Sequence, residues 1–140
     1  MFEIKRVTED DKKYWMSIDK HVSEKGFDYK VYGGLGYVMF NDEKPIGIMH
    51  YNLLWDNMPF LNFICIEQVY QQHGYGKMAM ELWEKEMKQL GFKMTLLSTQ
   101  VDEGPQFFYR KIGYKECGCL ILNDCPMEQA MEMFLCKTLK

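Results

Sequence analysis

The chain has 140 residues, of which 47% are hydrophobic and 26% are charged, and its net charge is −3 at pH 7. This length and balance are typical of one globular domain, and we expect a single domain over residues 1–140. The net charge excludes a general basic field for nucleic acid. No apolar run approaches the ~20 residues of a membrane-spanning helix, and the charged start MFEIKRVTEDD is not a signal peptide. We therefore expect a cytoplasmic protein that binds neither nucleic acid nor membranes.

The five cysteines are odd in number and lie in segments that predict regular structure, which is unlike a disulfide framework. We interpret them as reduced thiols. Zinc is the alternative for four of them, because a C-x-C pair in an alternating strand places two thiols on one face. No C-x-x-C and no nearby pair of histidines supports that alternative, so no metal is expected. The four residues concerned are Cys117, Cys119, Cys125 and Cys136.

The first quarter of the chain predicts a strand, a helix and an irregular connection. Alternating residues predict the strand over Phe2–Val7. Thr8 is a candidate N-cap, and the acidic residues after it favour a helix N-terminus. Apolar residues continue at helical spacing as far as Val22. The stretch Gly26–Gly36 is rich in glycine and aromatic residues, which predicts an irregular connection.

The next segment predicts three strands. Tyr37–Asn41 and Pro45–Trp55 are joined by a short polar turn. A second turn, WDNMP, leads to the third strand, Phe60–Ile66. This third run, FLNFICI, is almost entirely apolar, which is typical of a strand covered on both faces.

An amphipathic helix is predicted after the glycines at positions 74 and 76, with Gly91 as its stop. Its apolar residues recur at helical spacing, so we expect them to form one buried stripe. A buried strand is expected next, over Lys93–Thr99. The expected stripe consists of Ala79, Leu82, Trp83, Met87 and Leu90.

The end of the chain predicts a short helix and two strands. The helix is expected over Glu103–Ile112, with Asp102 as its cap and Pro105 in its first turn, where a missing N–H costs nothing. Strands are expected over Tyr114–Leu122 and Met131–Leu139. The order of elements is therefore mixed, with hairpins first and a strand–helix–strand–helix centre after them.

The stretch QQHGYGK, residues Gln71–Lys77, places two glycines at a helix start. Unpaired N–H groups and the helix dipole make such a start an anion site, and glycine lets a ligand approach where a Cβ would collide. A phosphate is the expected guest. The alternative is a tight turn that is glycine-rich for local reasons only.

Two familiar phosphate motifs fit this stretch poorly. The sequence has no Walker loop, G-x-x-x-x-G-K-[ST]. The segment from Gly74 to Ala79 matches the loose dinucleotide pattern G-x-G-x-x-A, but Gly74 stands eight positions after Ile66 instead of directly after the strand. The next strand also ends without the acidic residue that the pattern requires. The nicotinamide interpretation is therefore disfavoured.

With its neighbours included, the stretch resembles the GNAT superfamily of N-acetyltransferases. The cofactor signature of that family, [RQ]-x-x-G-x-[GA] after a central strand, is matched by Gln71–Gly76. A second signature, N-x-x-A-x-x-F-Y-x-K-x-G-F, is matched by Asp102–Tyr114, with Asp102 and Pro105 as departures. The resemblance covers nearly the whole chain and is that of a small bacterial single-domain member.

The resemblance implies an α/β fold, with a mixed, mostly antiparallel twisted sheet of about six to seven strands flanked by helices. It implies transfer of an acetyl group from acetyl-CoA to a primary amine, by direct attack in a ternary complex and without a covalent cysteine intermediate. A non-catalytic acyl-CoA-binding sensor or interaction module on the same fold is the alternative. The apolar C-terminal strands suggest a homodimer. The acceptor is left open among a protein, a polyamine, an antibiotic and an amino acid.

Roles for individual residues also follow from the resemblance. Tyr109 matches the family tyrosine near the coenzyme sulfur, where a phenol can protonate the departing thiolate. The central strand would pair its backbone with the pantetheine arm, and the next strand must then diverge from it. The residues implied in coenzyme binding are Ile64, Cys65, Ile66, Gln71, Gln72, His73, Gly74, Tyr75, Gly76, Lys77, Asp102, Phe108 and Lys111.

The acceptor amine must lose a proton before it attacks, and three residues are candidates for taking it: Glu67, His50 and Asp56. Glu67, at the end of the central strand, is the preferred base. Asp56 is also expected to bind a cationic amine on which Trp55 stacks. For each candidate the alternative is an ordinary solvated surface group. The residues expected on the acceptor side are Trp55, Asp56, His50, Glu24 and Tyr29.

Overall fold

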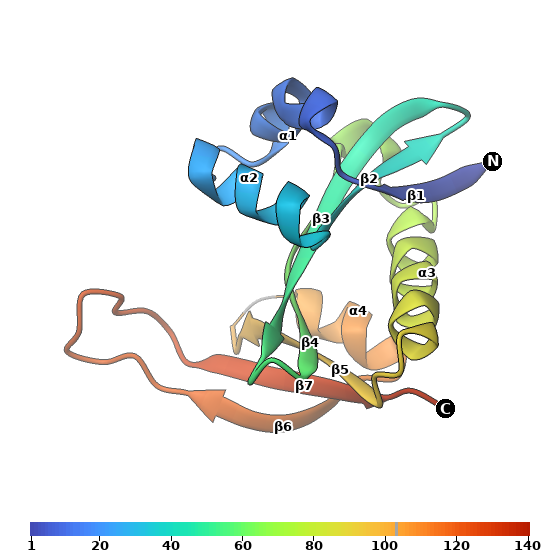
Figure 1. The fold of residues 1–140 in the computed structure, drawn as a ribbon. Coiled ribbons are helices and arrows are strands. Elements are labelled where there is room, and N and C mark those ends of the chain that lie inside the picture. The colour runs from blue at the N-terminus through green and yellow to red at the C-terminus, as the bar shows by residue number, and fades with distance from the viewer. Residues whose placement is uncertain (103) are drawn as a thin grey trace. The chain divides into compact units, whose positions relative to one another are not determined.

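The computed structural model describes residues 1–102 and 104–140. Within them, seven strands form one sheet in the order β1-β2-β3-β4-β5-β7-β6, with four α-helices and two short 3-10 helices, η1 and η2 (Figure 1). This mixed sheet with flanking helices confirms the predicted fold class. The strands are β1 (Phe2–Arg6), β2 (Gly36–Asn41), β3 (Lys44–Leu54), β4 (Met58–Ile66), β5 (Met94–Gln100), β6 (Lys115–Leu120) and β7 (Glu132–Thr138). The helices are η1 (Glu9–Asp11), α1 (Lys12–Ile18), α2 (Glu24–Gly33), η2 (Gln68–Tyr70), α3 (Tyr75–Gln89) and α4 (Pro105–Lys111).

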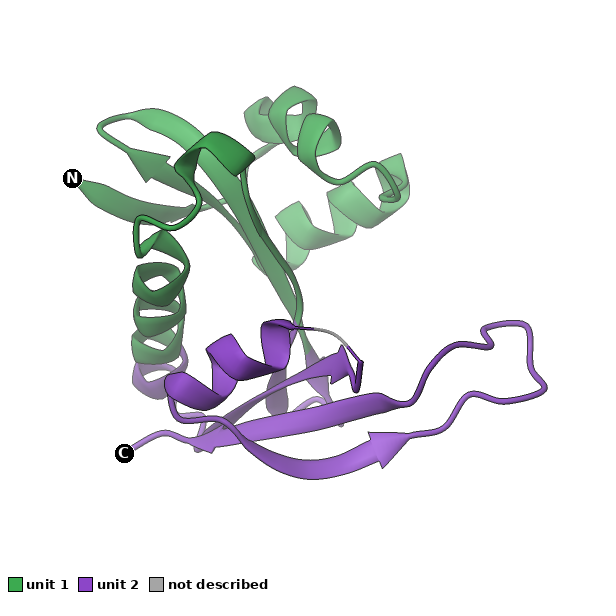
Figure 2. Ribbon diagram, turned by 180° about the vertical axis from the view of Figure 1, so that it is seen from behind, with its two compact units in different colours: residues 1–52, 62–86 green, residues 53–61, 87–140 purple. Residues whose placement is uncertain are grey.

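The chain divides into two compact units, each of which is described by itself (Figure 2). Unit 1 comprises residues 1–52 and 62–86, and unit 2 comprises residues 53–61 and 87–140. Strands β3 and β4 and helix α3 each contribute residues to both units. The single domain expected from the sequence stays a prediction.

In unit 1, the two faces of the β2–β3 hairpin pack against different helices, as Figure 1 shows. Val38 and Ile48 are register partners and lie in a buried cluster with Trp15 of α1 and Phe27 of α2. The preceding residue of β2, Tyr37, points to the other face, where its ring stacks on that of Tyr51, which in turn contacts Trp83 of α3. The alternation of strand side chains therefore produces a helix–sheet–helix arrangement within this unit.

Helix α2 corrects the prediction of an irregular connection over Gly26–Gly36. Ser23 caps this helix, because its hydroxyl accepts a hydrogen bond of 3.0 Å from the N–H of Gly26. Phe27 is fully buried, and Gly34 ends the helix in the left-handed conformation with φ 66°. Burial of one face and two good caps outweigh the low helix propensity of the glycines.

Two other helices differ from the prediction. The helix predicted after Thr8 is formed by the 3-10 turn η1 and α1, and it ends at Ile18, well before Val22. Asp19 explains the stop, because its carboxylate accepts a hydrogen bond of 3.0 Å from the N–H of His21 and so competes with a further helical turn. In α3, the predicted stripe is wrong at Leu82 and Leu90, which are exposed. The buried face is formed by Ala79, Met80, Trp83, Glu84 and Met87.

Unit 2 is built on an antiparallel core of β5, β7 and β6, in which β7 pairs with both neighbours. The start of β4 pairs parallel to β5 through Phe60 and Leu61. Helix α4 begins at Pro105, which lies in the first helical turn as predicted, but its N-cap is Gly104, so Asp102 is not the cap. The predicted first helical residue, Glu103, lies outside the described residues. Proline at the first helical position needs no N–H partner, which lets the helix start without a side-chain cap.

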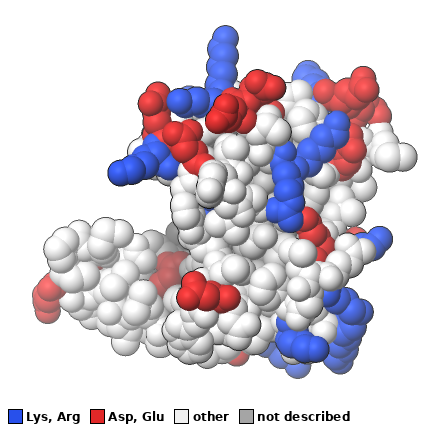
Figure 3. All heavy atoms as spheres, in the orientation of Figure 1, with Lys and Arg blue, Asp and Glu red and all other residues white. Residues whose placement is uncertain are grey.

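The described residues contain five free cysteines and no helix long and apolar enough to cross a membrane. In residues 1–102 and 104–140, no three or more His, Cys, Asp or Glu side chains are grouped so as to hold a metal ion. On the face shown in Figure 3, positive and negative side chains are interspersed over the helices of unit 1.

Gly47 fixes the distance between β3 and the end of β4. A Cβ at this position would collide with the backbone of Cys65 and would lie 3.0 Å from the Cα of Ile66. Both obstacles are main-chain atoms, which cannot swing aside, so the strands must separate to admit a side chain.

We expect Gly47→Ala to lower the free energy of unfolding by about 1–3 kcal/mol, measured by urea denaturation. Gly104→Ala is the matched control, because Gly104 has φ −67° and no atom lies within 4 Å of an added Cβ. Equal midpoints for the two variants would contradict the close approach of the strands.

Candidate active site

The predicted phosphate loop lies in unit 1 between η2 and α3, and its backbone bends twice through the left-handed region. Gln72 has φ 65° and Gly74 has φ 82°. A Cβ added at Gly74 would meet no atom within 4 Å. The glycine is therefore required by the backbone conformation, and the space beside it is open to a ligand.

Six consecutive backbone N–H groups in this loop, from Gln72 to Lys77, lack a hydrogen-bond acceptor among the described residues. The first N–H of α3 with a partner is that of Met78, which donates to Gly74 over 3.1 Å. A run of unpaired N–H groups at the start of a 15-residue helix attracts an anion through both the donors and the helix dipole.

The side chains of the loop brace its backbone. Gln71 donates from Nε2 to the carbonyl of Ile66 over 2.8 Å. Nδ1 of His73 lies 2.8 Å from the carbonyl of Gln71, so this nitrogen is the protonated one. Tyr75 stacks between His73 and Phe2, with ring centroids 5.8 and 5.3 Å away. Lys77 is exposed and 4.0 Å from Glu81. The loop is thus held by unit 1 itself.

The end of β4 differs from the prediction of a strand covered on both faces. Phe63, Ile64, Cys65 and Ile66 are all only partly buried. An apolar strand of this composition is normally buried, so its partial exposure, one short 3-10 helix before the loop, leaves a surface suited to an apolar group of a ligand.

Glu67 follows β4 and is held at both its main chain and its side chain. Its N–H donates to Ile46 over 2.9 Å, and its carbonyl accepts from Tyr70 over 2.8 Å. Its Oε2 accepts a hydrogen bond of 2.7 Å from the hydroxyl of Tyr14 in α1. The pKa of Tyr14 is raised mainly by burial and to a lesser extent by the hydrogen bond to Glu67. The phenol therefore stays protonated and can donate this bond.

His50, predicted on the acceptor side, lies in β3 between two aromatic rings. Its ring centroid is 5.6 Å from that of Phe63 and 5.6 Å from that of Trp15. Its Nε2 is 3.8 Å from Asp19, and its buried Nδ1 has no hydrogen-bond partner among the described residues. Burial, assisted by the charge of Lys30 and opposed by Asp19, lowers the pKa of His50 to about 4. The imidazole is therefore neutral at pH 7 and a weak base.

Lys30 is a buried cation that sequence reasoning missed. Its Nζ donates to the carbonyl of Tyr51 and to Oδ1 of Asn52, both over 2.8 Å. Burial lowers the pKa of Lys30 to about 8. The signal was hidden because α2 was predicted as an irregular connection, in which no residue is assigned to a buried helix face.

In unit 2, Tyr109 is buried on α4, in edge-to-face contact with Phe108 and Tyr114 at centroid distances of 5.2 and 6.0 Å. Burial raises the pKa of Tyr109 to about 12, which keeps the phenol protonated at neutral pH. Its hydroxyl has no partner among the residues that the structure describes, whereas the hydroxyl of Tyr114 bonds Thr95 over 2.8 Å.

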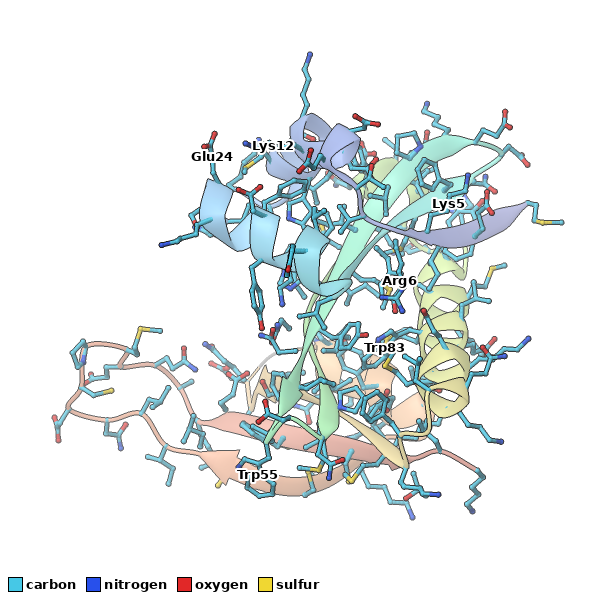
Figure 4. All side chains as sticks on the ribbon, in the orientation of Figure 1. Lys5, Arg6, Lys12, Glu24, Trp55 and Trp83 are labelled. Carbon is cyan, nitrogen blue, oxygen red and sulfur yellow. The ribbon has the colours of Figure 1, made fainter. Side chains whose placement is uncertain are left out.

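The other predicted residues are exposed. Trp55 and Asp56 form the β3–β4 turn in unit 2, with φ values of 55° and 57°, as in a tight two-residue hairpin turn (Figure 4). In unit 1, the carboxylate of Glu24 in α2 lies 3.3 Å from Nζ of Lys12 in α1, and both residues are labelled in Figure 4. The remaining exposed residues of the predicted sites are Tyr29 in unit 1 and Asp102, Phe108 and Lys111 in unit 2.

The model of the acetyltransferase (GNAT) family matches residues 4–114, so the chain belongs to that family. This confirms the resemblance found in the sequence. None of the curated proteins compared with the chain matches it.

Solved structures share the fold over nearly the full length. The ribosomal-protein-S18-alanine N-acetyltransferase from Escherichia coli is similar with a TM-score of 0.81 and 17% identity, over 100% of this chain and 95% of that one. Naa50 from Arabidopsis thaliana, in complex with the bisubstrate analogue CoA-Ac-MVNAL, has a TM-score of 0.78 and 10% identity, over 97% of each chain. The PaiA N-acetyltransferase from Thermoplasma acidophilum, in complex with coenzyme A, has a TM-score of 0.71 and 17% identity, over 99% of each chain.

Proposed function

We propose that this protein transfers the acetyl group of acetyl-CoA to a primary amine. The observation that carries the proposal is the run of six unpaired N–H groups from Gln72 to Lys77, beside the open space at Gly74. A pyrophosphate offers acceptor oxygens and negative charge to these donors. The partly exposed end of β4 gives the pantetheine arm an apolar strand with which to pair. Coenzyme A in complexes of similar proteins is consistent with this reading.

Direct attack of the amine on the thioester is the proposed reaction. Glu67 takes a proton from the amine, the amine nitrogen forms a bond to the acetyl carbon, and the carbon–sulfur bond breaks. Tyr109 gives its proton to the departing thiolate, and the pKa raised to about 12 by burial keeps that proton on the phenol at neutral pH until the thiolate forms.

Two other titratable groups, Cys65 as a nucleophile and His50 as a general base, are poorly suited to those roles, which supports this assignment. Burial, with Glu67 and Asp19, raises the pKa of Cys65, which makes its thiol a weak nucleophile and disfavours an acetyl-cysteine intermediate. His50 is a weak base at neutral pH, and we assign it to acceptor binding together with Glu24, Tyr29, Trp55 and Asp56.

The first test is the melting temperature with and without acetyl-CoA, beside NAD and ATP. A ligand at ~100 times its dissociation constant adds about 2.7 kcal/mol, which raises the melting temperature of a domain of this size by several degrees. We expect a rise with acetyl-CoA only. No rise, or a rise with NAD only, would refute the proposed coenzyme.

Turnover separates an enzyme from a non-catalytic sensor of acyl-CoA. Release of free thiol from acetyl-CoA is followed with a panel of polyamines, amino acids, aminoglycosides and peptides. Intersecting initial-rate lines with a productive amine support a ternary complex, whereas parallel lines indicate a covalent acetyl-enzyme. Binding without turnover on any amine favours the sensor.

A further inference from the structure

The two carboxylate oxygens of Glu67 differ in their hydrogen bonding. Oε2 accepts the 2.7 Å hydrogen bond from Tyr14, and no partner of Oε1 is found among residues 1–102 and 104–140. The backbone on both sides of this side chain is fixed by the bonds to Ile46 and Tyr70. One oxygen is therefore anchored and the other is open to a proton.

The anchor itself is rigid. Tyr14 packs against the buried cluster that contains Trp15, Phe27 and Ile48, so its ring is held by the core of unit 1. Its hydroxyl reaches Glu67 across 53 positions of sequence. A hydroxyl on a rigid ring fixes the direction of the carboxylate better than a flexible side chain does, because few rotamers are available to it.

We propose that Tyr14 is a positioning residue, which holds Glu67 by Oε2 so that Oε1 receives the proton of the acceptor amine. The inference rests on the proposed function of Glu67 as the base and goes beyond it, because it gives Tyr14 a role that acts through Glu67.

Three titratable groups interact with the carboxylate of Glu67. They are Tyr14 from α1, Cys65 from β4 and Lys44 from β3. Tyr70, and to a lesser extent Glu67, raise the pKa of Lys44, which therefore stays positive across the neutral range. Cys65, with its raised pKa, stays neutral there. Only Tyr14 donates a hydrogen bond to the carboxylate among the described residues.

The test compares Tyr14→Phe with Tyr32→Phe, a control that removes a hydroxyl from a residue that is 96% exposed. In protein labelled with ¹³C at glutamate carboxyls, the Glu67 signal is assigned by its loss in Glu67→Gln. We expect Tyr14→Phe to change the chemical shift of this signal, because Oε2 loses its hydrogen-bond donor, and Tyr32→Phe to leave it unchanged. An unchanged chemical shift in Tyr14→Phe would overturn the proposal without any assay of turnover.

Kinetics give the second readout. Tyr14→Phe should lower kcat about tenfold and leave KM for acetyl-CoA unchanged. A purely structural role would lower the melting temperature and leave kcat of the folded protein close to that of wild type. Loss of activity in Glu67→Gln with wild-type kcat in Tyr14→Phe refutes the inference and keeps the function. Wild-type protein with neither a coenzyme shift nor turnover refutes both.

Discussion

Replacing Tyr109 with phenylalanine is expected to lower kcat by about 10²-fold, because general acid catalysis typically contributes this much. The KM for acetyl-CoA should change much less, since the ring and its contacts with Phe108 and Tyr114 are retained. The pKa of about 12 also predicts that wild-type kcat does not fall through ionisation of Tyr109 below about pH 10. Steady-state kinetics with a productive amine check both expectations.

Tyr114→Phe is the matched control for this variant. It removes a neighbouring buried hydroxyl, the one that bonds Thr95 over 2.8 Å. We expect it to cost about 1 kcal/mol of stability and to leave kcat close to that of wild type. If the two variants lost activity equally, the effect would come from packing of α4 and the general-acid assignment would be wrong.

Gly74→Val is expected to weaken acetyl-CoA binding at least tenfold, or about 1.4 kcal/mol. A side chain at this position fills the open space beside the unpaired N–H groups and also disfavours the left-handed φ of 82°. Isothermal titration calorimetry measures the affinity, and the melting temperature without ligand measures the strain separately.

Gly91→Val separates the two effects. Gly91 stands just after α3, has φ 96°, and has no atom within 4 Å of an added Cβ. It therefore suffers the same kind of backbone strain in equally open surroundings, at the opposite end of the same helix. We expect a similar loss of stability and an unchanged affinity for acetyl-CoA. Unchanged affinity in Gly74→Val would sink the phosphate-loop assignment.

The strands of this protein could be predicted because their alternation and their turns are local in sequence. Helix α2 could not, because Gly26, Gly33 and Gly34 lower the helix propensity that local reasoning measures. The helix forms because Phe27 is buried against α1 and the sheet, a contact that joins distant parts of the chain. Tertiary burial outweighed propensity there, and it also decided which face of α3 is buried.

The candidate site also has parts that are local in sequence, which could be predicted, and parts that depend on contacts between distant residues, which could not. The loop from Gln71 to Lys77 was predictable, since its glycines and the helix after it are contiguous in sequence. The pairing of Tyr14 with Glu67 was not, since 53 positions separate them and nothing in either segment indicates the other. Lys30 was missed for a related reason, because only folding brings its Nζ to Tyr51 and Asn52.

The three indoles of the chain lie in contrasting surroundings. Trp15 and Trp83, both in unit 1, are fully buried, and Trp55, at the β3–β4 turn of unit 2, is 81% exposed. We therefore expect Trp15 and Trp83 to emit at shorter wavelengths and to resist quenching by iodide, and Trp55 to emit at longer wavelengths and to be readily quenched. A single unlabelled sample should then report the melting of unit 1 at short wavelengths and any contact made at the turn at long wavelengths.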